Sequence, residues 1–162
     1  AHSTEFQPGA TQAVISELPD QKAIEGLGGT MRLGGQDVDV APDTLASALF
    51  DGQSRVRERF RHRYEVEPSC IEHLEQAGMI FSGRHPLHPI MQIMELPQSV
   101  HPYFIGAQFH PELTSRPLMP QPLFMGLMAA AARRADPAAD MPARWLPEVA
   151  ATHAPAPSRA VP

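Results

Sequence analysis

The sequence has little of three features that mark whole classes of proteins. It contains one cysteine among 162 residues, no apolar run close to the roughly 20 residues of a membrane span, and fewer Lys and Arg (13) than Asp and Glu (18). A single cysteine excludes an internal disulfide framework and favours a reducing, cytoplasmic setting. The formal net charge of -5 leaves no broad basic field for a phosphate backbone or an anionic membrane. We therefore expect neither nucleic acid nor membrane as a partner.

The two ends of the chain carry separate signals. It opens on Ala1 without an initiator Met, a basic n-region or an apolar h-region, and we expect it to be a piece of a longer protein. From residue 135 onward the composition is Ala, Pro and scattered charge, with Trp145 and Leu146 as apolar exceptions. Such a composition buries too little apolar surface to fold. We expect one domain over residues 1–134 and a disordered tail over residues 135–162.

Alternating and apolar runs predict a sheet. Gly34 and Gly35 separate two alternating segments and predict a hairpin centred on them. Short apolar, aromatic or β-branched runs predict further strands over residues 59–66, 79–83, 90–96 and 103–109. The last of these is expected to lie inside the sheet.

Three segments have helical patterns. Asp43 or Thr44 precedes apolar residues at helical spacing and predicts the N-cap of a short helix. A second helix starts at Pro68 and ends at Gly78. The third covers residues 122–134. Short strands mixed with short helices predict an α/β or α+β domain, in which helices cover a sheet. The stripe expected to be buried on the third helix is Leu123, Leu127 and Ala130.

The stretch GAQFHPELTSRP, residues 106–117, places an imidazole and a carboxylate where a strand ends. His110 closes an apolar run, and Glu112 follows two residues later. An isolated pair of this kind is more often a surface histidine and a surface glutamate. Pro111, however, restricts its own φ and the conformation of the residue before it, which stiffens this transition. A histidine oriented by a carboxylate supplies two of the three members of a nucleophilic triad.

The third member of such a triad is a nucleophile. Cys70 is the only thiol, and it falls in the first turn of the second helix, where a helix N-terminus can activate a thiol. It lacks the glycine-rich flanks that form a tight nucleophile elbow with oxyanion-binding amides. We therefore interpret Cys70 as a packing residue.

The segment RERFRHRYEV, residues 57–66, places two arginines on one face of a strand. With a period of two, Arg61 and Arg63 point the same way. One interpretation is a solvated basic edge strand paired with Glu58 and Glu65. The other is a fork for a carboxylate or phosphate ligand. Spacing alone does not separate the two.

Two further segments carry weaker signals. Glu5, in STEF, is in isolation a residue typical of a helix start. His85 and His88 have a spacing that could ligate a metal, but no second pair of ligands accompanies them. We expect no metal site.

Four segments together resemble one family. In chain order they are STEF at 3–6, GGTMRLG at 28–34, ERFRHRYEV at 58–66 and GAQFHPELTSRP at 106–117. As a set they are similar to the C-terminal half of the class I glutamine amidotransferase domain of the CTP synthase family, over residues 1–134. His-Pro-Glu alone indicates only the amidotransferase class, and the second and third segments indicate the CTP synthases. The resemblance implies an α/β, flavodoxin-like, three-layer domain that is incomplete in this chain.

The resemblance also implies an activity. In this family the amidotransferase domain hydrolyses glutamine to glutamate, and the ammonia passes to a synthase domain where UTP, activated by ATP, becomes CTP. No cofactor is implied for this segment. ATP and Mg belong to the synthase domain, GTP is an allosteric activator, and the full-length enzyme is expected to be a cytoplasmic homotetramer.

Matching motif positions imply roles for five residues. His110 would be the base of the triad, and Glu112 the carboxylate that orients it. Glu5 would contact the α-ammonium of glutamine and Arg63 its α-carboxylate, since a zwitterion needs one anion and one cation at a fixed separation. Arg32 is similar to a residue of the lid linked to activation by GTP.

Departures from the family pattern leave two functions open. The family's nucleophilic cysteine and oxyanion-hole glycines lie upstream of the segment equivalent to STEF, so we expect this chain alone to be inactive. His2 and Phe60 stand where the family more often has Asn and His, and Glu67 where it has Asn. In the first, the chain is part of a glutamine-hydrolysing ligase. In the second, it is a non-catalytic remnant that binds or regulates a partner enzyme.

Overall fold

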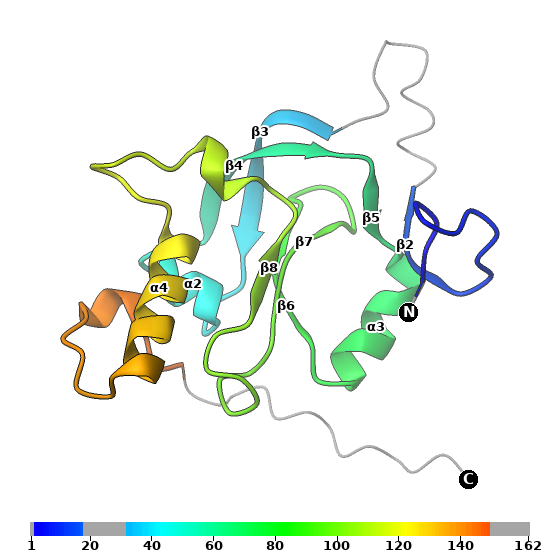
Figure 1. Cartoon of the computed structure of the whole chain (residues 1–162). Coiled ribbons are helices and arrows are strands. Elements are labelled where there is room, and N and C mark those ends of the chain that lie inside the picture. Colours follow the sequence, from blue (N-terminus) through cyan, green and yellow to red (C-terminus); the bar gives the residue numbers. More distant parts are fainter. Residues whose placement is uncertain (1, 18–31, 150–162) are drawn as a thin grey trace, which may run out of the picture.

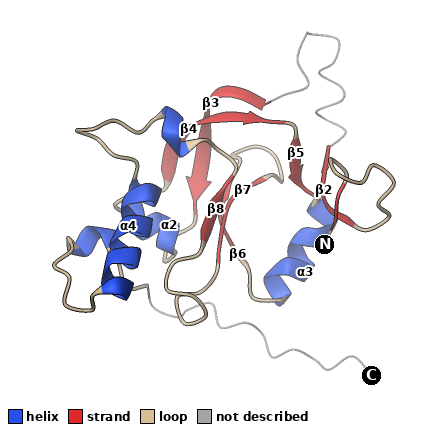
Figure 2. Cartoon of the chain, in the orientation of Figure 1, coloured by secondary structure: helices blue, strands red, loops and turns tan. Residues whose placement is uncertain are grey.

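The computed structural model describes residues 2–17 and 32–149, which form short strands with helices between and after them (Figure 1 and Figure 2). In chain order the elements, with η for a 3-10 helix, are β1 (His2–Ser3), β2 (Ala13–Glu17), β3 (Arg32–Val40), α2 (Leu45–Leu49), β4 (Arg55–His62), β5 (Tyr64–Val66), α3 (Pro68–Gln76), β6 (Ile80–Arg84), β7 (Met91–Glu95), β8 (Ile105–Ala107), η2 (Pro111–Leu113), α4 (Pro122–Ala135) and η3 (Ala143–Trp145).

The strands form two sheets. The larger has five strands in the order β4-β3-β6-β7-β8, and every pairing in it is antiparallel. The smaller has three strands in the order β1-β2-β5, with β1 parallel and β5 antiparallel to β2. Figure 1 shows α2 and α4 on one side of the larger sheet and α3 beside β2 and β5 on the other.

The hairpin expected at Gly34 and Gly35 is wrong. β3 runs straight through both glycines for 9 residues and pairs along its length with β4, from Arg32 opposite His62 to Asp39 opposite Arg55. Gly34 takes a φ of 83°, which glycine adopts without strain, and the strand continues beyond it. The partner strand β4 supplies the backbone hydrogen bonds that a turn at the glycines would have broken.

The first two helices confirm their predicted starts. Thr44 is the N-cap of α2, and its side chain accepts a hydrogen bond from the Ser47 N–H at 3.1 Å. α3 begins at Pro68, and Gly78 beyond its end has a φ of 97°. α3 packs on a small core made of Val66, Phe81 and Met91, with Ile15, Ile71, Leu74, Met79 and Met94 around it.

The buried stripe expected on α4 is confirmed at Leu123 and wrong at Leu127. Leu123, Gly126 and Ala129 are buried, whereas Leu127 is 51% exposed. Gly126 explains the rotation, because a Cβ at this position would lie 2.7 Å from the Tyr103 ring and 2.9 Å from Leu49. The helix therefore approaches α2 and Tyr103 along its glycine face, which the apolar periodicity of α4 does not reveal.

The last strand lies at an edge of the larger sheet, so its expected place inside the sheet is wrong. β8 pairs with β7 alone among the named strands. Just beyond it, Phe109 forms an antiparallel bridge with Phe60 of β4, the strand at the opposite edge. The sheet is therefore curled, and the chain leaving β8 meets the end of β4.

The segment after α4 packs on the domain, which corrects the expectation of a free tail from residue 135. η3 carries Trp145, which is 8% exposed and belongs to the main core with Leu45, Leu49 and Leu123. The Gln98 amide is hydrogen-bonded to the Pro147 carbonyl and to the Val149 N–H, at 2.9 and 2.8 Å. The rest of the expected tail, residues 150–162, lies outside the described residues. Neither described stretch contains a helix with the length and apolar character that crossing a membrane requires.

Trp145→Ala should destabilise the domain strongly. Removing a buried indole leaves a cavity in the main core, and we expect the free energy of unfolding to fall by about 3–5 kcal/mol. Leu118→Ala is the matched control, because Leu118 is fully exposed and its loss should change stability by less than about 0.5 kcal/mol. Urea unfolding followed by circular dichroism measures both. Equal midpoints for the two variants would contradict the packing of Trp145.

Candidate active site

His110 lies where the chain leaving β8 crosses the end of β4. Its backbone N–H donates to the Arg59 carbonyl at 2.8 Å, directly after the Phe60–Phe109 bridge. His110 is the N-cap of η2, and its carbonyl accepts from the Leu113 N–H at 3.0 Å. The strand pairing before His110 and the helical turn after it hold this backbone on both sides.

The structure brings His110 and Glu112 together. Nδ1 of His110 lies 2.7 Å from Oε1 of Glu112, and the two side chains are 39% and 57% exposed. The hydrogen bond from His110 holds the pKa of the Glu112 carboxyl below its ordinary value. Because Nδ1 faces the carboxylate, Nε2 is the ring nitrogen that can exchange a proton with a substrate or a nucleophile.

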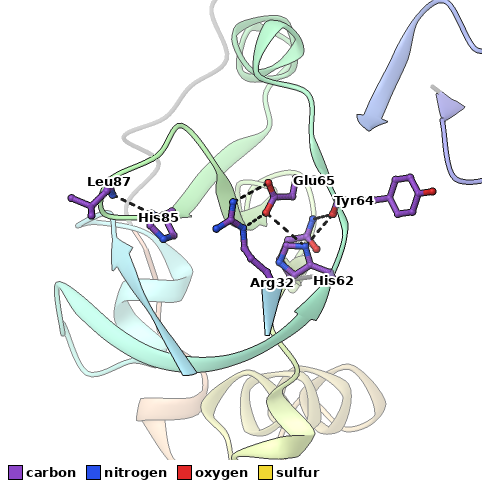
Figure 3. A network of polar contacts seen from close by, with 7 residues as sticks. Arg32, His62, Tyr64, Glu65, His85 and Leu87 are labelled. Atoms are coloured by element: carbon purple, nitrogen blue, oxygen red, sulfur yellow. Dashed lines mark hydrogen bonds and ion pairs between the residues drawn. The ribbon is translucent and has the colours of Figure 1, made fainter. Parts of the chain in front are cut away.

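A second cluster of polar side chains surrounds Glu65, which is fully buried (Figure 3). The guanidinium of Arg32 donates to both carboxylate oxygens of Glu65, the longer contact being 3.4 Å. Figure 3 shows His62 on the other side of the same carboxylate, with Nδ1 3.8 Å from Oε1. Because a buried carboxylate requires such partners, Glu65 of β5 fixes the position of the Arg32 side chain.

His62 connects this cluster to the strand that leads to His110. Its Nδ1 lies 3.2 Å from the Tyr64 carbonyl, which can only accept, so Nδ1 carries the proton. The same carbonyl accepts from the Gln108 amide at 3.3 Å. Burial lowers the pKa of His62, and the charges of Arg32 and His110 lower it further, against the opposing charge of Glu65. The lowered pKa favours the neutral form of this partly buried side chain.

The arginines of β4 follow the predicted alternation. Arg61 is exposed, and Arg63 is exposed on the bend between β4 and β5, whereas His62 is partly buried. β4 is an edge strand with exposed arginines, as one interpretation expected. The pairing with Glu58 and Glu65 is wrong, since both are buried and bond other residues. In the described residues, no hydrogen bond or ion pair joins Arg63 to the His110 and Glu112 pair.

Four other predicted residues lie elsewhere. Glu5 is exposed in the turn after β1, where its N–H donates to the Ser3 hydroxyl at 3.2 Å. Cys70 is partly buried, with its thiol 3.8 Å from the Ala13 carbonyl. The rings of His85 and His88 lie 4.8 Å apart. Within the described ranges, no three His, Cys, Asp or Glu side chains gather as a metal site would require.

One buried carboxylate that bonds the segment after Glu112 was missed by the sequence reasoning. Glu58 is 6% exposed, and it accepts hydrogen bonds from Thr114 and Gln121, which follow Glu112 in sequence. The signal was present in the alternation of RVRERFRH, because Val56 and Phe60 face inward and a period of two places Glu58 on the same face.

Known proteins are similar to this chain in sequence and in fold. The sequence matches the model of the family described as Glutamine amidotransferase class-I over residues 9–130. It is 50% identical to the CTP synthase of Thermococcus gammatolerans over 135 residues, which are 83% of this chain and 25% of that protein. It is 49% identical to the CTP synthase of Methanopyrus kandleri over 132 residues, which are 82% of this chain and 24% of that protein.

A solved structure agrees with these matches. The Trypanosoma brucei CTPS glutaminase domain with bound acivicin superposes with a TM-score of 0.73 at 32% identity, covering 82% of this chain and 50% of that one. This likeness confirms the amidotransferase fold expected from the resemblance. The chain spans about a quarter of the length of the curated relatives that it matches. Since the family match covers most of the sequence, this chain belongs to the class I glutamine amidotransferases.

Proposed function

We propose that this chain is the C-terminal part of the glutamine amidotransferase domain of a CTP synthase. That domain would release ammonia from glutamine for the ATP-dependent amination of UTP to CTP in a separate synthase domain. The observation that carries the proposal is the 2.7 Å contact between His110 and Glu112 at the end of a strand. The identity of about 50% with CTP synthases supports it.

In the proposed reaction His110 is the general base. Glu112 holds the Nδ1–H and stabilises the imidazolium, so that Nε2 takes a proton from a thiol and later returns it to the departing ammonia. We place the nucleophilic cysteine outside the 162 residues. Cys70 lies on α3 with its thiol toward the Ala13 carbonyl, and no contact joins it to His110 in the described part of the chain.

Glutamine binding is assigned to two exposed charges. Arg63 would bind the α-carboxylate with a bidentate guanidinium, and Glu5 would accept from the α-ammonium. Both side chains are exposed, as residues that meet a ligand must be. Burial of Glu65 leaves Arg63 without that carboxylate as a competitor, since Glu65 bonds Arg32 instead.

The partners belong to the complete enzyme. We propose a cytoplasmic homotetramer, with ATP, Mg and UTP in the synthase domain and GTP as an activator. Arg32 is the residue assigned to the GTP-linked lid. Its guanidinium bonds Glu65 in this structure, so a nucleotide that recruits it would share it with a buried carboxylate.

His110→Ala should abolish glutamine-dependent CTP formation in the complete enzyme while sparing synthesis from free ammonia. Loss of a general base should lower the glutamine-dependent kcat by about a thousandfold or more, because proton transfer to and from the amide fails. Glu112→Gln should lose less, since the carboxylate only orients and stabilises the imidazole. Steady-state rates with each nitrogen donor make the comparison.

The controls separate the site from the fold. His73→Ala removes an exposed histidine of α3 and should leave both rates unchanged. Arg63→Ala should raise the KM for glutamine by about tenfold to a hundredfold, whereas Arg55→Ala should not. Equal loss with glutamine and ammonia in the His110 variant would contradict the assignment. A complete protein with neither activity would favour the non-catalytic remnant.

The pKa of Glu112 should depend on His110. Because the bonded carboxylate has a lowered pKa, the pair forms at pH values above the ordinary glutamate pKa and is lost as the pH falls through the lowered one. In His110→Ala the Glu112 pKa should rise toward its ordinary value. Carbon-13 NMR titration of the side-chain carboxyl measures it, with His73→Ala as the unchanged control. Identical titrations in the two variants would show that no such contact forms.

A further inference from the structure

Glu58 is a carboxylate on the inward face of β4. Its neighbours on that face are Val56 and Phe60, 9% and 1% exposed, and Glu58 itself is 6% exposed. Burial raises the pKa of this carboxyl, and hydrogen bonds from Gln121 and Thr114 oppose the rise. A buried acid is costly unless its oxygens are satisfied, so the identity of its partners matters.

Both partners come from the segment that follows His110 and Glu112. Oε2 of Glu58 accepts from the Thr114 hydroxyl at 3.0 Å, and Oε1 accepts from the Gln121 amide at 3.0 Å. The Thr114 hydroxyl also lies 3.2 Å from the Pro111 carbonyl, and the Thr114 N–H donates to that carbonyl at 3.2 Å. Glu58 therefore holds, through Thr114, the single helical turn on which Glu112 is carried.

The neighbouring residues of β4 hold the other side of the same turn. The Arg59 carbonyl accepts from the His110 N–H, and Phe60 bridges Phe109. The contacts of β4 thus fall before His110 and after Glu112. The short turn between them contains both side chains of the pair, so the distance between Nδ1 and the carboxylate depends on both attachments.

We infer that Glu58 is a positioning residue for the His110 and Glu112 pair, acting through the Thr114 hydroxyl. Glu58 also bonds Gln121, which is the N-cap of α4 and accepts from the Leu123 N–H at 2.7 Å. The turn is thereby attached to β4 and indirectly to α4. Its effect on glutamine hydrolysis rests on the proposed function, whereas its effect on the pair itself does not.

A purely structural role for Glu58 makes different predictions. If Glu58 only satisfied the start of α4, its loss would lower stability without altering the contact between His110 and Glu112. If it positions the pair, a variant that keeps the fold should still weaken that contact. Thr114 allows the distinction, because valine has nearly the same shape as threonine but no hydroxyl.

The first readout is the Glu112 pKa, measured by carbon-13 NMR on the 162-residue chain. Thr114→Val and Glu58→Gln should raise it toward its ordinary value, since the bond to His110 would form for less of the time. Thr114→Ser keeps the hydroxyl and should retain the lowered pKa. Glu75→Gln, which removes one partner of the exposed Arg84 ion pair at 3.3 Å, is the matched control and should change nothing.

The second readout is kinetic and uses the complete enzyme. A small displacement of a catalytic group is costly, so Thr114→Val should lower the glutamine-dependent kcat by about tenfold to a hundredfold. The KM for glutamine should change less than about twofold, the ammonia-dependent rate should hold, and Thr114→Ser should restore kcat.

Each outcome of these measurements supports or overturns the positioning role of Glu58 or the part of the Thr114 hydroxyl in it. A Glu112 pKa that stays lowered in folded Thr114→Val and Glu58→Gln would overturn the positioning role, as would unfolding of both variants, which would assign Glu58 to the fold alone. A raised pKa in a complete enzyme that hydrolyses no glutamine would retain the positioning role and reject the proposed function. Equal kinetic losses in Thr114→Val and Thr114→Ser would exclude the hydroxyl as the link.

Discussion

The crossing of β4 by the chain that leaves β8 is the contact on which the candidate site depends. Phe60 bridges Phe109, and the next backbone bond joins Arg59 to His110. β4 and β8 are the two edges of the five-stranded sheet, so this contact exists only because the sheet curls. Without it, His110 would follow an unpaired edge strand, and no fixed backbone would hold its imidazole near Glu112.

Buried carboxylates hold the surroundings of this crossing together. Glu58 bonds the turn after Glu112, Glu65 bonds Arg32, and Glu95 accepts from the N–H groups of Leu45 and Ala46 at the start of α2. Each lies on a strand and reaches donors on a segment distant in sequence. Because an unsatisfied buried carboxylate is costly, these acids select the arrangement in which their donors are present.

The charges of this region divide into an interior and an exterior set. The interior set includes Glu65, Arg32 and His62, whereas Arg61, Arg63 and Glu112 face solvent. Because burial alternates along β4, its neighbouring residues Arg61 and His62 belong to different sets. This separation leaves exposed charges available to a zwitterionic ligand while the buried ones maintain the backbone that carries them.

The sequence by itself determined the local features of this protein. Thr44 and Pro68 start helices, Gly78 ends one, and the alternation of β4 orients its arginines, because each depends only on neighbouring backbone geometry. Motif resemblance likewise identified the fold and drew attention to His110 and Glu112. Tertiary structure decided the rest. Gly34 and Gly35 lie within a strand because β4 pairs with it, and Gly126 rotates α4 because Tyr103 packs there. Trp145 is buried, and Glu58 faces the turn after Glu112, because segments distant in sequence meet at those positions. Such meetings arise from the packing of the whole chain and leave no periodic trace in any one stretch of it.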